Sequence, residues 1–287
     1  MDLQVLVSGA LASCLYATLA LSYFLIVRAT RLVNFAVGGY GVFAGIGIAY
    51  LVARGWPTPG AVVAGLLAAV VLAVATELIV VRVMERRQSG LATIEIAIVA
   101  VLFVIEQGAG LLFGRQPSLV ITWLDGGVRI GDTRVPHQAL LTVALTLAVF
   151  GAVAWWLSRA RFGRMLRAVG DNPGAAEVLG LPVARVRTMG MVVAGLAAGV
   201  AGVLATTQSA LTVEAGTSFT LLGFIALVLG GTAHVWAPLA GGALLGFLEA
   251  LSARVLGNDV RDYMLLALVL VVFTFRPKGL FAVKERT

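Results

Sequence analysis

The chain has 287 residues, of which 60% are hydrophobic and only 12% are charged. A soluble domain carries roughly 25% charged residues, so this composition, with its repeated apolar runs of roughly 20 residues, excludes an ordinary soluble domain and predicts a polytopic membrane protein. The formal net charge of +7 is better explained by Lys and Arg in cytoplasmic loops than by nucleic-acid binding, and the lone Cys14 excludes an intrachain disulfide.

Nine apolar segments follow one another along the chain, at approximately residues 4–27, 33–53, 59–81, 91–113, 138–158, 188–208, 218–231, 237–256 and 263–275. The segments 218–231 and 263–275 are short for a membrane span of roughly 20 residues. The segment 33–53 contains five glycines, Asn34 and Tyr40, which favours a broken helix. We therefore expect an all-α fold, in which residues 1–287 form a single transmembrane bundle of eight or nine membrane segments with one or more broken or short helices.

The distribution of Lys and Arg among the loops predicts the orientation of the chain. If the N-terminus lies outside and the segments alternate, most of the 21 Lys and Arg residues fall in inside loops. Cytoplasmic loops carry such an excess. We therefore expect an external N-terminus and a cytoplasmic C-terminus, with residues 114–137 as the longest external loop and residues 159–188 as a cytoplasmic loop.

The loop at 114–137 contains the stretch VITWLDGGVRIGDTRV, in which apolar and polar residues alternate around Asp125-Gly126-Gly127. Alternation around a turn sequence of this kind indicates a β-hairpin. Two readings of the loop stay open: it covers helix ends, or it forms a docking surface for an external partner.

The loop at 159–188 contains the polar stretch RFGRMLRAVGDNPGAAEVLGLPVARVR at residues 161–187. Asn172 is a good N-cap and Pro173 suits the first helical position. Gly180 suits the residue just past a helix end, and Pro182 blocks continuation. The sequence thus predicts a helix of about two turns. Because a helix this short is unstable alone in water, it must lean on the helix ends of its own chain or on a cytoplasmic partner.

In the same stretch, Arg161, Arg164 and Arg167 are spaced by three residues, so they lie on one side of a helical turn. This spacing is typical of a segment that lies at the membrane surface with its arginines facing anionic lipid.

The sequence shows no pattern for catalysis, nucleotide binding or metal binding. It has neither a GxxxxGK[ST] phosphate loop nor a GxSxG nucleophile motif. His137 and His234 are far apart, and neither has a nearby Cys or second His. We therefore expect no catalytic residues, no metal and no cofactor bound by this chain.

Polar residues at membrane depth are costly, and they are the candidates for a substrate path. The selected candidates are Asn34, Glu95, Glu106 and Gln208, taken from a wider set that also contains Gln107, Thr206, Thr207 and Glu249. Glu95 and Glu106 are close to three helical turns apart and share a face. For every candidate the alternative is a hydrogen bond between helices or a position at the membrane edge.

Four stretches, in this order, resemble the permease subunits of branched-chain amino acid ABC importers. They are RLVNFAVGGYGVFAG (31–45), the polar stretch at 161–187, VLGGTAHVWAPLAGGALLGFLEAL (228–251) and FRPKGLF (275–281). The chain departs from the family pattern in two places. Val37 and Gly39 stand where the family commonly has His and an acidic residue, and His234, Trp236 and Pro238 interrupt a late segment that is usually close to GGxGSxxGAxxGG.

The resemblance implies a passive, non-catalytic transmembrane half of an ATP-driven importer in a prokaryotic cytoplasmic (inner) membrane. Its partners would be a second permease (a homologue or a copy), two cytoplasmic ATPases that bind ATP and Mg, and an external substrate-binding protein. The family's loop that meets the ATPase corresponds here to residues 159–188, which gives these coupling residues: Asn172, Pro173, Gly174, Ala175, Ala176, Glu177, Val178, Leu179 and Gly180.

Leucine, isoleucine and valine are the family's default substrates, and urea, short amides and other small solutes occur among its relatives. The alternative function is a self-contained secondary carrier or channel that uses membrane Glu residues for ion coupling. Whether the permease pairs with a copy or a homologue stays open, since Gly195-x-x-x-Gly199 permits close helix packing without naming a partner.

Overall fold

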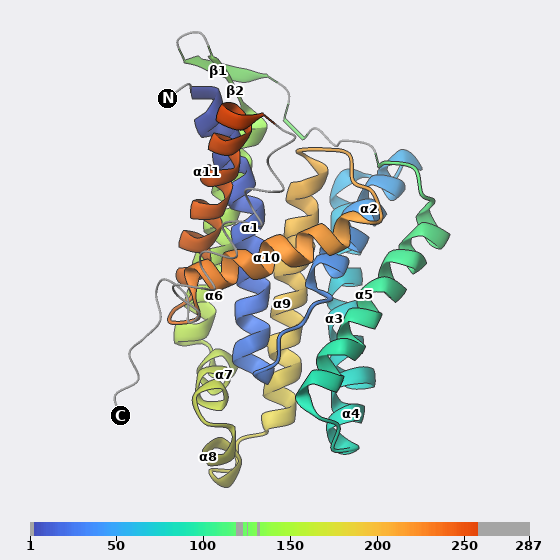
Figure 1. Cartoon of the computed structure of the whole chain (residues 1–287), viewed down its shortest axis with the longest axis vertical. Coiled ribbons are helices and arrows are strands. Elements are labelled where there is room, and N and C mark those ends of the chain that lie inside the picture. Colours follow the sequence, from blue (N-terminus) through green and yellow to red (C-terminus); the bar gives the residue numbers. More distant parts are fainter. Residues whose placement is uncertain (1–2, 119–122, 125, 131–132, 258–287) are drawn as a thin grey trace.

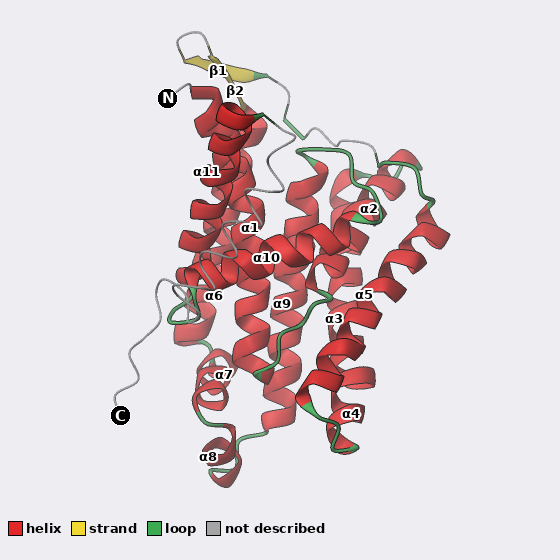
Figure 2. Ribbon diagram, viewed as in Figure 1, coloured by secondary structure: helices red, strands yellow, loops and turns green. Residues whose placement is uncertain are grey.

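The computed structural model describes residues 3–118, 123–124, 126–130 and 133–257. Within these residues the chain is a bundle of helices with one β-hairpin at one end (Figures 1 and 2). The elements in chain order are α1 (Leu3–Thr30), α2 (Val37–Ala53), α3 (Thr58–Ala75), the π-helix η1 (Thr76–Val81), α4 (Arg82–Arg86), α5 (Leu91–Phe113), β1 (Gly127–Ile130), β2 (Thr133–Pro136), α6 (His137–Arg159), α7 (Arg161–Asp171), α8 (Pro173–Val178), α9 (Val183–Thr206), α10 (Ala215–Gly230) and α11 (Ala237–Leu256).

Six helical stretches of the described residues are long and apolar enough to cross a membrane, and α2 and α10 are shorter apolar helices. The six are α1, the continuous run α3–η1–α4, α5, α6, α9 and α11. The predicted all-α membrane bundle is confirmed for these residues. Eight of the nine predicted apolar segments coincide with helices, while the ninth, 263–275, lies outside the described residues, so the number of spans and the orientation remain predictions.

The spanning helices fall into an inner and an outer group. In α1 and α9, 78% and 67% of the apolar 18-residue stretch that could span the membrane is buried. In α3–η1–α4, α5 and α6, only 28% of the corresponding stretch is buried. The outer helices expose large apolar side chains such as Val71, Ile96 and Leu111. An apolar outer surface of this kind is typical of helices that face lipid.

The apolar run at 33–53 forms a short helix and not a broken one: residues 33–36 lie outside any helix, and α2 runs without interruption from Val37 to Ala53. Side chains hold the residues that precede it. The Asn34 Oδ1 atom accepts a hydrogen bond from the Ala36 N–H at 2.9 Å. The Thr220 hydroxyl donates to the Phe35 carbonyl and accepts from the Gly38 N–H, at 3.0 and 3.1 Å. These bonds satisfy backbone groups that the beginning of α2 leaves unpaired.

The helix α10 is too short to span and lies across the bundle in Figure 1. Small residues let it pass close to three other helices. Gly216 lies against Gly39 of α2, Gly223 against Leu19 and Tyr23 of α1, and a Cβ at Gly230 would collide with the backbone of α11. Glycine therefore permits each of these close approaches.

The motif Gly195-x-x-x-Gly199 on α9 packs inside the chain. An added Cβ at Gly195 would meet the backbone of Ala69 and Val70, and one at Gly199 would meet Leu66. Both sites belong to α3. The motif is therefore buried between α9 and α3 and does not provide a surface for a second permease.

A hairpin joins α5 to α6, but its turn lies later than Asp125-Gly126-Gly127. The strands pair antiparallel with Gly127 opposite Pro136 and Ile130 opposite Thr133. The alternation of side chains identified the hairpin. The turn was misplaced because Gly126 and Gly127 form an earlier turn signal, and Gly127 is itself the first residue of β1.

Candidate functional site: a capped helix, a buried ion network and a polar pocket

The predicted two-turn helix is present as α8, which runs from Pro173 to Val178. The Asn172 side chain caps it, since its Oδ1 atom accepts a hydrogen bond from the Ala175 N–H at 3.0 Å. Past its end, Gly180 has a φ of +76°, a left-handed conformation that glycine adopts without steric cost. Local caps at both ends thus define this helix.

In Figure 1, α7, α8 and α4 lie at the end of the bundle opposite the hairpin. We call these two ends the α8 end and the hairpin end. In α8 only Ala176 is buried. Val178 and Leu179 at its C-terminus are 89% and 79% exposed. The helix therefore presents two apolar side chains that its own chain does not cover.

Polar contacts between α1 and α7 hold the base of this projection. The Arg31 guanidinium donates to the carbonyls of Gly170 and Asp171 at 3.1 and 2.7 Å. Arg28 forms an ion pair of 2.9 Å with the Asp171 carboxylate. Because Asp171 directly precedes the cap residue Asn172, these contacts fix where α8 begins.

A groove of about 600 Å³ lies beside α8, between α7 and the segment that leads into α9. Its charged lining residues are Arg161, Arg164 and Arg185, and its apolar ones include Phe162, Met165 and Leu181. Arg167, the third residue of the predicted arginine row, lines a different pocket. The surface next to α8 is therefore basic.

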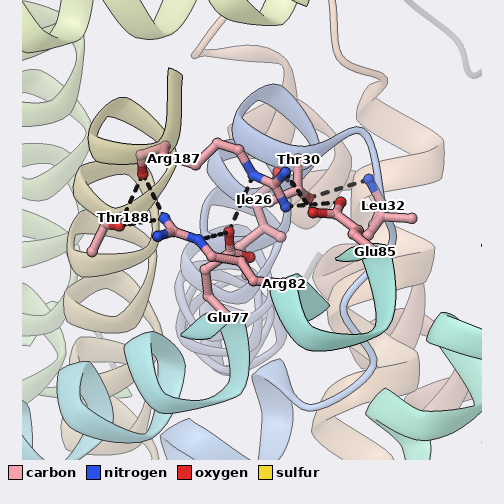
Figure 3. Close-up of polar contacts among 9 residues, drawn as sticks. Ile26, Thr30, Leu32, Glu77, Arg82, Glu85, Arg187 and Thr188 are labelled. Carbon is pink, nitrogen blue, oxygen red and sulfur yellow. Dashed lines mark hydrogen bonds and ion pairs between the residues drawn. The ribbon is translucent and has the colours of Figure 1, made fainter. Parts of the chain in front are cut away.

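A buried ion network connects α9 to η1 and α4 near the α8 end (Figure 3). Glu77 in η1 is fully buried. Its Oε1 atom lies 3.3 Å from the Nε atom of Arg82 and 3.1 Å from that of Arg187. The Arg187 Nε–H does not point at this oxygen, so the second contact is an ion pair without hydrogen-bond geometry.

The two arginines of the network extend it across the helices. Arg187 makes a two-pronged pair with the Glu85 carboxylate, at 2.9 and 3.1 Å. Arg82 donates to the Thr188 hydroxyl at 2.6 Å and to the Ala184 carbonyl. Bidentate, charge-assisted contacts of this type fix geometry as well as adding energy. They therefore fasten the beginning of α9 to η1 and α4.

Sequence reasoning missed this network. Glu77 lies in the stretch TELIVV inside an apolar run, and an acid in such a run is itself a signal. Its segment is a π-helix, and π-turns often occur at functional sites.

Two of the predicted path residues, Asn34 and Glu106, lie near the point where α2 and α10 begin. Asn34 is buried and donates to the Tyr40 hydroxyl at 3.1 Å. Glu106 is buried and accepts from the N–H and hydroxyl of Thr217, at 2.7 and 3.0 Å. Thr217 belongs to the first turn of α10, where a carboxylate is stabilised by the helix dipole. Both side chains thus pair with backbone groups at the beginnings of the short helices α2 and α10.

The other two candidates lie elsewhere. Glu95 is half-buried near the beginning of α5. Gln208 lines a pocket of about 660 Å³ at the hairpin end, together with Ser8, Gln138, Thr142 and Thr207. All of these polar groups are neutral amides or hydroxyls, and no ionisable side chain lines the pocket among the described residues. The structure therefore does not gather the four candidates into one site.

Short apolar helices that begin within the bundle, such as α2 and α10, are typical of membrane transport proteins. The comparison with known families is specific. Residues 5–274 match the family described as the permease component of branched-chain amino acid transport systems. The chain belongs to this family.

Curated relatives agree with the family over nearly the full length. The chain is 27% identical to BraD, a high-affinity branched-chain amino acid transport system permease protein of Pseudomonas aeruginosa, over 99% of this chain and 96% of BraD. It is also 27% identical to LivH of Escherichia coli, which has the same description, over 99% of this chain and 96% of LivH. A partial match of 29% identity, over 44% of this chain and 41% of the relative, links it to the ribose import permease protein RbsC of Haemophilus influenzae.

Proposed function

We propose that this chain is the non-catalytic transmembrane permease subunit of an ATP-driven importer and forms half of its translocation pathway. The family match and the full-length similarity to BraD and LivH support this function. The expected partners are a second permease, two cytoplasmic ATPases that bind ATP and Mg, and an external binding protein, in the inner membrane of a prokaryote. The substrate class is branched-chain or related small amino acids or amides.

In this proposal α8 is the ATPase contact, and one observation carries the assignment. Val178 and Leu179 are the exposed apolar residues at the end of a capped helix that its own chain supports only through Ala176. Burial of two such side chains would favour a complex by roughly 1.5–3 kcal/mol each before the costs of association. The basic groove beside α8 would then suit acidic residues of the same partner.

The ion network gives this contact a route into the bundle. Only a short linker, in which the Leu181 N–H donates to the Ala176 carbonyl at 3.0 Å, separates α8 from α9. Arg187 lies just beyond that linker and binds Glu77 and Glu85. A displacement of α8 by an ATPase would therefore move α9, η1 and α4 as one body.

At the other end, the hairpin-end pocket is our candidate for the first contact with delivered substrate. Its amides and hydroxyls can bind the polar groups of a small solute, and its position beside α6 and the end of α9 places it opposite α8. Because it carries no ionisable group among the described residues, we expect weak selectivity here and stronger selectivity in the external binding protein.

The test is co-purification of the chain with its ATPase after the double change Val178→Asp and Leu179→Asp. We expect loss of the ATPase, because two carboxylates replace the apolar contact. The matched control is Gln88→Asp, which adds a carboxylate at an exposed position of the same end, on the turn after α4. Full retention of the ATPase by the double variant would contradict the role of α8. Transport by the chain alone in liposomes, driven by an ion gradient, would support the secondary carrier instead.

A further inference from the structure

A second pocket near the α8 end is not part of the proposed coupling surface. It has a volume of about 480 Å³ and lies between the ends of α1 and α6, the helix α7 and the loop between α10 and α11. The lining residues that matter for its chemistry are Phe24, Arg28, Trp155, Ser158, Arg167 and Trp236.

The lining separates into a charged end and an apolar wall. Arg28 and Arg167 belong to the last turn of α1 and to α7, at the α8 end. Phe24 lies one turn deeper in the bundle than Arg28, and Trp155 lies almost one turn deeper than Ser158. The pocket is therefore basic towards the α8 end and aromatic towards the middle of the bundle.

The charges of this pocket favour an anion. Arg28 is held by Asp171 at 2.9 Å and donates to the carbonyls of Thr232 and Ala233, at 3.1 and 3.3 Å. Arg167 is exposed, and no acidic side chain lines the pocket among the described residues. The single negative charge of Asp171 balances only one of the three positive charges of Arg28, Arg31 and Arg167. Within the part of the chain that the structure describes, the Arg167 guanidinium makes no hydrogen bond or ion pair, so it can bind a ligand from outside the chain.

The aromatic wall favours an amphiphile. Trp155 is 66% exposed on the outside of α6, one of the outer helices. Trp236 is 43% exposed and stacks on Phe150 with ring centroids 5.9 Å apart. Tryptophan rings at a helix end are typical of the level of lipid headgroups.

We propose that this pocket binds the phosphate group of an anionic membrane lipid. Arg167 would bind the phosphate oxygens, a contact for which guanidinium geometry is well suited, and Arg28 would add positive charge beside them. The first carbons of an acyl chain would lie along Phe24, Trp155 and Trp236. Such a lipid would bridge α1, α6 and α7, and so brace the base of α8 independently of any ATPase.

The experiment titrates the purified full-length chain, in a non-ionic detergent, with dihexanoyl-phosphatidylglycerol and follows tryptophan fluorescence. We expect a saturable change, weaker binding of dihexanoyl-phosphatidylcholine, and no competition from inorganic phosphate. Arg167→Gln should weaken phosphatidylglycerol binding about tenfold, because a charge-assisted hydrogen bond is lost. Arg167→Lys, which keeps the positive charge, should retain most of the affinity for phosphatidylglycerol.

The control is Arg87→Gln, which removes one exposed guanidinium directly after α4, at the same end but outside the pocket. Equal weakening by Arg87→Gln and Arg167→Gln would show a general attraction to basic charge and overturn the site. Equal affinity for the two lipids, or the absence of binding, would also overturn it. Competition by inorganic phosphate at similar concentrations would assign the pocket to a free anion and overturn the lipid.

Discussion

At the α8 end, α9 is held by charged side chains, whereas at the hairpin end the same helix finishes among neutral ones. Near its beginning, Arg187 pairs with the carboxylates of Glu77 and Glu85. At its end, Thr207 and Gln208 line a pocket with a further amide and two hydroxyls. One helix thus connects a rigid, ionic junction to a neutral, open pocket.

Under the proposed function, the two ends would divide the work of a transport subunit. Charged pairs in a buried site lose much energy when their geometry changes, which suits a junction that must move as one body. Neutral hydrogen-bonding groups are easily satisfied by water or by a passing solute, which suits a place where substrate must bind and leave. Three predictions test this division, beginning with the largest effect.

The charged junction should respond most strongly. Arg187→Met leaves Glu77 buried with a single cationic partner and Glu85 without its bidentate one, so we expect a loss of about 3 kcal/mol in the free energy of unfolding. The measurement is denaturation with sodium dodecyl sulfate in mixed micelles. Arg185→Met, at an exposed position two residues earlier, is the control and should change stability little. If both variants lose the same amount, the network does not hold the helices together.

The capped helix should respond less. Asn172→Ala removes the bond to the Ala175 N–H and costs about 1 kcal/mol of helix stability. The affinity for the ATPase should therefore fall about fivefold in a pull-down titration. Asn172→Ser keeps a capping hydroxyl and should retain the affinity. Unchanged binding by the alanine variant would mean that the partner does not need a preformed α8.

A substitution in the neutral pocket should change the free energy of unfolding least and should act mainly on transport. Gln208→Leu removes one weak hydrogen bond, of 3.3 Å, to the Leu11 carbonyl. Loss of a neutral contact to substrate should raise the KM for uptake by the reconstituted complex about threefold, with a change in unfolding free energy below about 0.5 kcal/mol. Gln4→Leu, exposed on α1 at the same end and outside the pocket, serves as the control. A KM that is unaltered in Gln208→Leu would remove this residue from the path.

Local signals in the sequence predicted the helices and α8. Apolar runs gave the positions of eight helices to within a few residues, except that α2 and α9 begin four or five residues away from their predicted starts. The caps of α8 act within a few residues of the helix itself, so Asn172 and Gly180 could be assigned without tertiary information.

Contacts between distant segments could not be predicted in this way. Arg187 and Glu85 are 102 positions apart, and Glu106 and Thr217 are 111 apart. Asn34 and Glu106 were recognised as costly polar residues, but only the fold shows that they pair with backbone groups at the beginnings of α2 and α10. Whether any of the four path candidates contacts substrate stays a prediction.

The π-turn of η1 also determines in which direction around the helix axis the side chains of α4 point. A π-turn closes its hydrogen bond between residues i and i+5, so it takes up one more residue than an α-helical turn. Winding the same residues, Thr76 to Val81, as an ordinary α-helix would rotate Arg82 and Glu85 by about 100° relative to α3. Their side chains would then face away from Arg187, although every residue of the network was still present. The alignment of the ion network therefore depends on how the backbone of η1 is wound, and not only on which side chains are present.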